Sequence, residues 1–231
     1  RVSCIQMDML LGKEDYNFKH AQDLIRATVA QEHPDVVVLP ETWNVGFFPK
    51  EDLVSHCDQD GTRIKKEIGG LAKELNTNIV AGSIGNVKGG KVYNTAFVFD
   101  REGNCVYQYD KIHLFGFATE RESYDESASI CGGDNVVTFD APFGKVGLSV
   151  CYDLRFPELY RAFGECSLIV VPAAFTYTTG KVHWEILLRA RAIENQAYVL
   201  ASAQGGRHVT GRRTWGHTML VDPWGEVKAV L

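Results

Sequence analysis

Cys151 lies where a predicted strand meets a predicted helix. Residues 145–150 form a short apolar, β-branched run, which predicts a strand, and residues 156–158 open a helix with a proline in its first turn. A cysteine at such a junction is held by the strand and faces backbone N–H groups that stabilise a thiolate or an oxyanion. The position suits a nucleophile, but cysteine is often buried, and Cys151 alone fits an inert core position as well.

Two charged residues follow other predicted strands. Glu41 comes after the apolar run 36–39, which Pro40 ends, and Lys111 comes after the strand-like run 105–109. Three strand ends thus supply a carboxylate, an amine and a thiol. Each charge taken alone also fits a solvent-exposed loop, because Glu and Lys are mostly exposed.

Three sequence blocks resemble the signature blocks of the nitrilase, or carbon–nitrogen hydrolase, superfamily. They are LPE at 39–41, YDKIHL at 109–114 and GLSVCYDLRFPE at 147–158, and they occur in the family's order. The resemblance covers essentially the whole chain. It implies a catalytic set of Glu41, Lys111 and Cys151, and an α/β fold of two sheets between helical layers, the four-layer α-β-β-α sandwich.

These residue types suit acyl transfer. A free thiol has a pKa of about 8.5, so it is a weak nucleophile near neutral pH unless a base or a positive charge favours the thiolate. Glu41 is the candidate base for the attack of Cys151 on an amide carbon and for the later attack of water. Lys111 favours the thiolate and donates to the oxyanion, with the backbone N–H of Tyr152 as the candidate second donor.

The superfamily also uses a second glutamate between its Lys and Cys blocks, which helps to position the substrate and the lysine. Tyr124-Asp125-Glu126-Ser127 resembles that element, so the resemblance assigns Glu126. Glu120 and Glu122 are nearby competitors.

The later blocks resemble the Nit-type amidases, which hydrolyse side-chain amides of α-keto acids. Residues 172–180, 183–185 and 189–196 match this branch, and residues 203–208 and 216–225 look like deaminated glutathione amidases. Residues 44–49 instead resemble bacterial ω-amidase-like relatives. The exact substrate therefore stays open.

In Nit-type relatives an arginine four residues after the nucleophile, with a Phe and a Thr, holds the substrate's carboxylate. The matching positions are Arg155, Phe175 and Thr179. A planar guanidinium suits bidentate binding of a carboxylate. The alternative for Arg155 is a structural salt bridge to Glu158 or Asp153.

Other functions also fit part of the pattern. A nitrilase or an N-carbamoyl amino acid amidohydrolase uses the same three residues, and the block after Pro172 favours an amidase instead. A non-enzymatic partner protein has no need to keep Glu41, Lys111 and Cys151 together. A cysteine protease is disfavoured because none of the seven histidines stands in a recognisable Cys–His signature.

Composition is that of an ordinary soluble globular protein. The 231 residues are 45% hydrophobic and 23% charged, with a net charge of −5 and scattered Lys and Arg, so neither nucleic acid nor a membrane surface is an expected partner. No apolar run is long enough to span a bilayer. The six cysteines form no disulfide framework and no metal-ligand spacing, so we predict a cytoplasmic enzyme without metal or cofactor.

Strands and helices alternate along the chain, which predicts a single α/β domain over residues 1–231. We expect strands at 2–7, 36–39, 78–82, 91–99, 105–109, 136–140, 145–150, 168–171, 198–203 and 214–221. The expected helices are 17–30, 62–75, 157–163 and 182–194, and residues 115–135 are a long, functional loop.

The resemblance further implies a homodimer or higher homo-oligomer that packs through the helices at about 156–165 and 182–194. It also implies a final strand and a C-terminal tail beyond the turn at 222–225, and we expect that tail to be absent from residues 1–231.

Overall fold

The computed structural model describes residues 1–46, 52–118, 120 and 123–231. Its first sheet runs in the order β1-β2-β4-β5-β6, with β3 paired to β4. β1, β2 and β4 are parallel, and β5 and β6 continue the sheet antiparallel. The strands are β1 (Val2–Cys4), β2 (Val36–Val38), β3 (Asp58–Gln59), β4 (Asn78–Lys88), β5 (Lys91–Phe99) and β6 (Cys105–Asp110).

The second sheet runs in the order β16-β15-β12-β11-β10-β9. Its central strands β10, β11 and β12 are parallel, so their carboxyl ends meet at one edge. The strands are β9 (Val137–Ala141), β10 (Gly144–Leu148), β11 (Leu168–Ala173), β12 (Tyr198–Ala203), β15 (Met219–Val221) and β16 (Val227–Val230).

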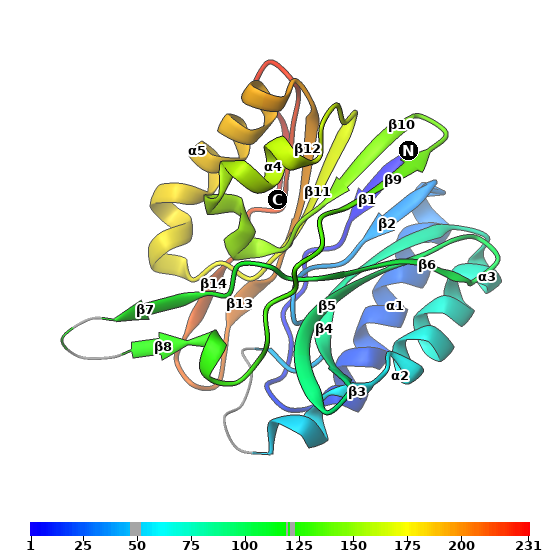
Figure 1. The fold of residues 1–231 in the computed structure, drawn as a ribbon. Coiled ribbons are helices and arrows are strands. Elements are labelled where there is room, and N and C mark those ends of the chain that lie inside the picture. The colour runs from blue at the N-terminus through cyan, green and yellow to red at the C-terminus, as the bar shows by residue number, and fades with distance from the viewer. Residues whose placement is uncertain (47–51, 119, 121–122) are drawn as a thin grey trace.

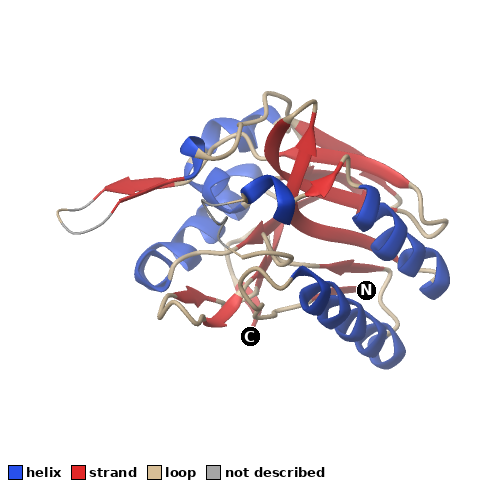
Figure 2. Ribbon diagram, turned by 90° about the horizontal axis from the view of Figure 1, so that it is seen from below, coloured by secondary structure: helices blue, strands red, loops and turns tan. Residues whose placement is uncertain are grey.

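Helices cover the outer face of each sheet (Figures 1 and 2). The first sheet carries α1 (Glu14–Glu32) and a continuous helix made of α2 (Thr62–Ile64), a π-helical turn (Lys65–Gly69) and α3 (Gly70–Leu75). The second sheet carries α4 (Pro157–Ala162) and α5 (Tyr177–Asn195). The predicted α-β-β-α sandwich is confirmed.

Alternating strand residues build the two sides of the core. In β2, Val37 packs with the cluster that includes Phe18 of α1, whereas Val38 packs with the cluster that includes Val171 of the second sheet. This alternation follows from the strand geometry, because successive side chains point to opposite faces. The sheets are thus held face to face, and loops at their common edge are brought together.

The strand predicted at 2–7 ends at Cys4, and the strand predicted at 78–82 runs on to Lys88. Two other predicted segments differ from the structure in type. Residues 115–135 are not one loop, since they contain the hairpin β7 (Gly116–Ala118) and β8 (Ser123–Asp125), which projects from the body in Figure 1, and a 3₁₀ turn (Glu126–Ala128). Residues 214–221 are not one strand. They divide between β14 (Arg213–Trp215), which pairs with β13 (Gly205–Arg207), and β15 of the second sheet.

The start of α5 also differs from the prediction. The helix begins at Tyr177 and not at 182, because Thr176 caps it by accepting a 3.4 Å hydrogen bond from the Thr179 backbone N–H through its hydroxyl oxygen. Residues 47–49 of the block at 44–49 and the competitor Glu122 lie outside the described residues.

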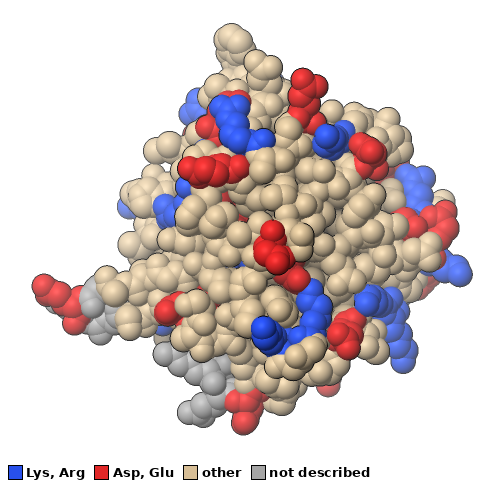
Figure 3. All heavy atoms as spheres, in the orientation of Figure 1, with Lys and Arg blue, Asp and Glu red and all other residues tan. Residues whose placement is uncertain are grey.

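Charged side chains of both signs are interspersed over the face seen in Figure 3. Within the ranges given above, no helix is long and apolar enough to cross a membrane.

Candidate active site

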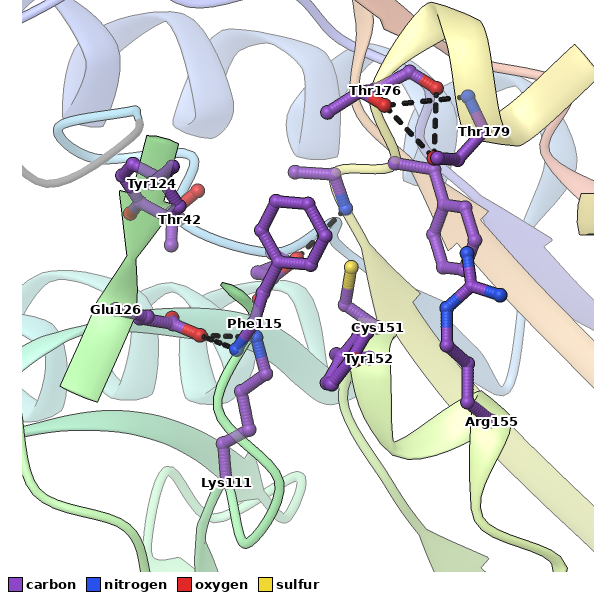
Figure 4. A pocket seen from close by; sticks show the side chains of 13 residues that line it. Thr42, Lys111, Phe115, Tyr124, Glu126, Cys151, Tyr152, Arg155, Thr176 and Thr179 are labelled. Atoms are coloured by element: carbon purple, nitrogen blue, oxygen red, sulfur yellow. Dashed lines mark hydrogen bonds and ion pairs between the residues drawn. The ribbon is translucent and has the colours of Figure 1, made fainter. Parts of the chain in front are cut away.

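Cys151 begins a short 3₁₀ helix (Cys151–Arg155) directly after β10 and residues 149–150. Its backbone is in the left-handed region, with a φ of +51°, a conformation that costs a non-glycine residue about 1–3 kcal/mol and is concentrated at functional sites. The side chain is 7% exposed. In Figure 4 its sulfur points into the space between the Lys111 side of the pocket and the Arg155 side.

Asp153 fixes this turn and ties it to the end of β6. Its buried carboxylate accepts hydrogen bonds from the backbone N–H of Val150 (2.9 Å), the hydroxyl of Tyr109 (2.7 Å) and the backbone N–H of His113 (3.0 Å). Tyr109 and His113 flank Lys111 in sequence. One carboxylate therefore sets the position of the thiol relative to the amine.

Glu41 follows β2 and is 4% exposed. Its Oε1 accepts hydrogen bonds from Lys111 Nζ (2.8 Å) and Asn94 Nδ2 (2.9 Å), and its Oε2 accepts one from the backbone N–H of Ala174 (2.9 Å). Asn94 lies in β5 and Ala174 follows β11, so the carboxylate joins both sheets. Such a set of contacts holds Glu41 in one orientation beside Cys151.

Lys111 is 1% exposed and sits between two carboxylates. Its Nζ lies 2.8 Å from Glu41 and 2.9 Å from Glu126 Oε2, which also accepts from the Phe115 backbone N–H (2.6 Å). Burial by itself lowers the pKa of Lys111, but the Glu126 and Glu41 carboxylates outweigh it and hold the pKa well above its ordinary value. The amine therefore stays cationic.

The surroundings of the Cys151 thiol favour its neutral form, whereas those of Lys111 favour the charged form. Burial, and then the charge and hydrogen bond of the Glu41 carboxylate, raise the pKa of Cys151 well above its ordinary value, against the opposing charge of Lys111. The resting thiol therefore keeps its proton, with a carboxylate beside it to accept that proton. This arrangement suits attack on a carbonyl carbon with proton transfer to Glu41 in the same step.

One pocket collects all the predicted residues. The eight predicted residues that line it are Glu41, Lys111, Glu126, Cys151, Tyr152, Arg155, Phe175 and Thr179. The structure thus brings every one of them together, from both sheets and from the start of α5, while their individual roles remain predictions.

Sequence and structure comparisons give the pocket its context. The profile described as carbon-nitrogen hydrolase matches residues 1–231. The chain belongs to the carbon–nitrogen hydrolase family. The prediction of an enzyme of this family is therefore confirmed, and the pocket lies at the position of all three signature blocks of this hydrolase.

Relatives of this carbon–nitrogen hydrolase include two amidases at 38% identity. Omega-amidase NIT2 of Mus musculus aligns over 98% of this chain and 82% of its own length, and the deaminated glutathione amidase of Dictyostelium discoideum over 98% and 81%. Among solved structures, the C. elegans NitFhit protein has a TM-score of 0.88 at 35% identity, covering 100% of this chain and 57% of its own. Saccharomyces cerevisiae Nit3 has a TM-score of 0.86 at 29% identity, covering 100% and 84%.

Arg155 does not make the structural salt bridge that was the alternative to carboxylate binding. Within the described ranges neither Glu158 nor Asp153 pairs with it. The guanidinium carbon lies 5.6 Å from the ring centre of Phe175, and Nη2 lies 3.3 Å from His183 Nδ1. A half-buried cation on the pocket wall, with no anion from these residues, is available to an anionic ligand.

Glu126 and its competitor Glu120 differ in burial. Glu126 is 4% exposed and reaches Lys111, whereas Glu120 is exposed at the edge of the hairpin. Glu122 lies outside the described residues. The structure thus favours Glu126 over Glu120 as the carboxylate that holds Lys111.

Several pocket residues escaped the sequence analysis. Asn94 donates to both Glu41 and Glu126 (2.9 and 3.3 Å), and the only signal for it is one amide in the apolar run of β5. Asn94 does not itself line the pocket; the unpredicted residues that do are Thr42, Phe115, Tyr124, Ala174 and Thr176. Aromatic and small residues of this kind carry no chemical signature, so only the fold identifies them. Across the described part of the chain, no cluster of three or more His, Cys, Asp or Glu side chains could hold a metal ion.

Proposed function

We propose that this hydrolase is a thiol amidohydrolase that cleaves a side-chain amide of an α-keto acid or a related small carboxylate through a Cys151 acyl-enzyme. The observation that carries the proposal is the buried Lys111 amine, which lies 2.8 Å from Glu41 and 2.9 Å from Glu126 in the pocket of Cys151. A base, a fixed cation and a thiol converge there, as acyl transfer requires.

The proposed reaction has two stages. Glu41 takes the thiol proton as Cys151 attacks the amide carbon, and Lys111 Nζ and the Tyr152 backbone N–H stabilise the oxyanion. Glu41 then returns the proton to the departing amine or ammonia as the C–N bond breaks. In the second stage Glu41 activates the water that hydrolyses the thioester, while Glu126 keeps Lys111 in place.

The substrate class rests on Arg155, Phe175 and Thr179. Arg155 offers a planar cation to a carboxylate, and Phe175 and Thr179 belong to the same wall. Relatives named omega-amidase and deaminated glutathione amidase support amides of α-keto acids such as α-ketoglutaramate or deaminated glutathione. We further propose that residues 1–231 form one domain that acts in the cytoplasm without a cofactor; the six free cysteines are consistent with a reducing compartment.

A substrate panel tests the proposed function. Release of amine or ammonia is measured with deaminated glutathione, α-ketoglutaramate, a simple nitrile and an N-carbamoyl amino acid. We expect one of the two keto-acid amides to have the highest kcat/KM. Dominant turnover of the nitrile or of the N-carbamoyl substrate would replace this proposal by the corresponding alternative.

Arg155→Lys tests the carboxylate site. The variant keeps the charge but loses the planar fork, so activity on carboxylate-bearing amides should fall by about 1.5 to 3 kcal/mol of transition-state binding. A neutral analogue of the same amide should be nearly unaffected. The measurement is kcat/KM on both substrates together with the thermal midpoint. Equal losses on the two substrates would show that Arg155 does not bind the carboxylate.

We also propose that two copies pair through α4 and α5. Val182, Ile186 and Ile193 are 53%, 69% and 52% exposed, and they stand four and seven residues apart on one side of α5. An exposed apolar stripe of this kind is typical of a subunit interface. The family resemblance implies pairing through the same two helices, α4 and α5.

Ile186→Lys is expected to weaken this dimer. A charge placed in the centre of an apolar interface costs about 2 kcal/mol or more, which raises the dissociation constant at least about thirtyfold. Analytical ultracentrifugation over a range of concentrations measures it. Val54→Lys, at a 52% exposed position far from α5 in sequence and on the other half of the fold, is the matched control. A parent protein that is monomeric at all concentrations would refute the dimer.

A further inference from the structure

Thr42 directly follows the proposed base, and both residues line the catalytic pocket. Two successive residues of an extended chain point to opposite sides, so a shared pocket requires the chain to turn between Glu41 and Thr42. The turn is present, because Thr42 has a φ of +46°, in the left-handed region. This conformation is a genuine outlier for a β-branched residue, and such strain is concentrated at functional sites.

Hydrogen bonds from distant segments hold this turn in place. The backbone N–H of Glu41 donates to the Ala173 carbonyl (3.5 Å), and Gln204 Nε2 donates to the Glu41 carbonyl (3.2 Å). On the other side, the backbone N–H of Gly46 donates to the Thr42 carbonyl (2.7 Å). The backbone is therefore fixed on both sides of the Thr42 side chain, which gives its hydroxyl a defined place in the pocket wall.

The Thr42 hydroxyl is buried and unpaired. The residue is 4% exposed, and none of the residues that the structure describes forms a hydrogen bond with its Oγ1. Nearly all buried polar groups in proteins have a partner, because leaving one unpaired costs free energy. Two other threonines of the pocket follow this rule, since the hydroxyls of Thr176 and Thr179 lie 2.8 Å apart. The Thr42 hydroxyl is therefore free to bind a ligand in the pocket.

Thr42 lies on the side of the pocket away from the proposed carboxylate site. In Figure 4 Thr42 and Glu126 are at the left, Arg155 is at the right, and Cys151 lies between them. In the proposed mechanism Arg155 binds the carboxylate of the acyl part. The side that holds Thr42 then receives the leaving amine and, after the amine has departed, the water that hydrolyses the thioester.

The hydrolytic water needs two hydrogen-bond acceptors, because it attacks through an oxygen lone pair and has two O–H groups to donate. Glu41, as the proposed base, accepts from one of them. The three groups that the structure shows bound to the Glu41 carboxylate are N–H donors, so they cannot accept from the other. Both oxygens of Glu126 already accept from N–H groups. The unpaired Oγ1 of Thr42 supplies the second acceptor.

Resting on the proposed function, we propose that the Thr42 hydroxyl binds and orients the water that hydrolyses the Cys151 thioester. One O–H of the water donates to Thr42 Oγ1 and stays intact. The other gives its proton to Glu41 as the water oxygen bonds to the thioester carbon. The C–S bond then breaks, its electron pair stays on the sulfur, and Glu41 returns the proton to the sulfur. The products are a free carboxylic acid and the thiol, so Thr42 acts in deacylation and not in acylation.

Thr42→Val tests this role, because it removes the hydroxyl and keeps the β-branched shape. Steady-state kinetics and intact mass during turnover are measured with the keto-acid amide that the parent hydrolyses best. Deacylation should slow by about tenfold or more, so kcat and KM fall together and an acyl-enzyme accumulates at Cys151. The value of kcat/KM should stay within about threefold, because it reports the steps up to departure of the amine. Thr42→Ala, which also lacks the hydroxyl, should behave alike, and Thr42→Ser should restore kcat.

Ser83→Ala is the matched control, because Ser83 also carries a buried hydroxyl without a partner among the described residues but does not line the pocket. It should keep the parental kcat and show no added acyl-enzyme. A fall in kcat/KM of Thr42→Val without accumulation would place Thr42 at the leaving amine and overturn the proposal. An unchanged kcat, or an equal loss in Thr42→Ser, would overturn it too, and in all these cases the amidase function stands. A parent that releases no amine from either keto-acid amide would overturn both.

Discussion

Cys151→Ala is expected to reduce amide hydrolysis by roughly 10⁴-fold or more while the fold stays intact. The substitution removes the sulfur that forms the proposed acyl-enzyme, so the loss should appear in kcat. The sulfur points into the pocket, so its removal enlarges an existing cavity and leaves no sealed void in the core. Steady-state turnover and the circular-dichroism melt are measured on the same preparation.

Cys166→Ala provides the control for this substitution. Cys166 is another buried free cysteine, 9% exposed, and its sulfur contacts the Phe163 carbonyl outside the pocket. That variant should keep full activity. Mass spectrometry of the parent during turnover should detect acyl addition at Cys151. Residual activity of Cys151→Ala within about tenfold of the parent would exclude covalent catalysis by this residue.

The geometry of the thiol explains why a cysteine in a strand-like run was open to two interpretations. From its sequence neighbours Cys151 fits a buried core position, and the structure does bury it to 7% exposure. The feature that distinguishes it is a φ of +51°, which the sequence does not display because no glycine marks the turn. Asp153 stabilises this strained backbone conformation. Its carboxylate accepts hydrogen bonds from Val150 and Tyr109, and these bonds form only when both sheets are in place.

The sequence predicted most of the sheets because their patterns are local. The strand at 198–203 has the expected limits, and the alternation of Val37 and Val38 between two core clusters follows from strand geometry alone. Short apolar runs that end in Pro40 or at Lys111 likewise marked the strand ends that carry the catalytic candidates. Local pattern and family order therefore predicted which residues meet.

The local sequence pattern could not predict which segments pair with distant parts of the chain. The β7–β8 hairpin has three residues in each strand, and the polar composition of 115–135 favoured a loop. Residues 214–221 read as one strand, but Gly216 has a φ of +69° and the chain leaves β14 there for the second sheet. The sequence analysis missed Asn94 for the same reason. Its side chain donates hydrogen bonds to the carboxylates of Glu41 and Glu126, which come from distant parts of the chain.

The buried charges around Lys111 have a consequence for catalysis. One amine between two carboxylates leaves a net negative set, and this set disfavours a resting thiolate at Cys151, as its raised pKa shows. In the proposed mechanism the thiol proton passes to Glu41 when the substrate arrives, and negative charge develops on the oxyanion near Lys111. In that mechanism the site stabilises the transition state more than a free thiolate.

Glu41→Gln tests this arrangement. The amide keeps the size of the side chain and retains one oxygen acceptor, but it cannot take a proton, so kcat/KM should fall by about 10²- to 10⁴-fold. Removing the carboxylate should at the same time lower the pKa of Cys151, because the charge of Glu41 is one of the causes that raise it. The variant should therefore be a poor hydrolase whose thiol is alkylated by iodoacetamide with a pH midpoint below that of the parent.

Glu126→Gln distinguishes the proposed role of Glu41 as a base from its role as a negative charge beside Lys111. Glu126 also pairs with Lys111, at 2.9 Å, and also accepts from Asn94, so the two variants lose the same charge from the same lysine. The charge of Glu41, however, also raises the pKa of Cys151. We expect Glu126→Gln to lose less activity and to shift the alkylation midpoint less than Glu41→Gln does. If both variants lost activity equally and shifted the midpoint equally, Glu41 would act only through Lys111, and the proton of Cys151 would need another acceptor.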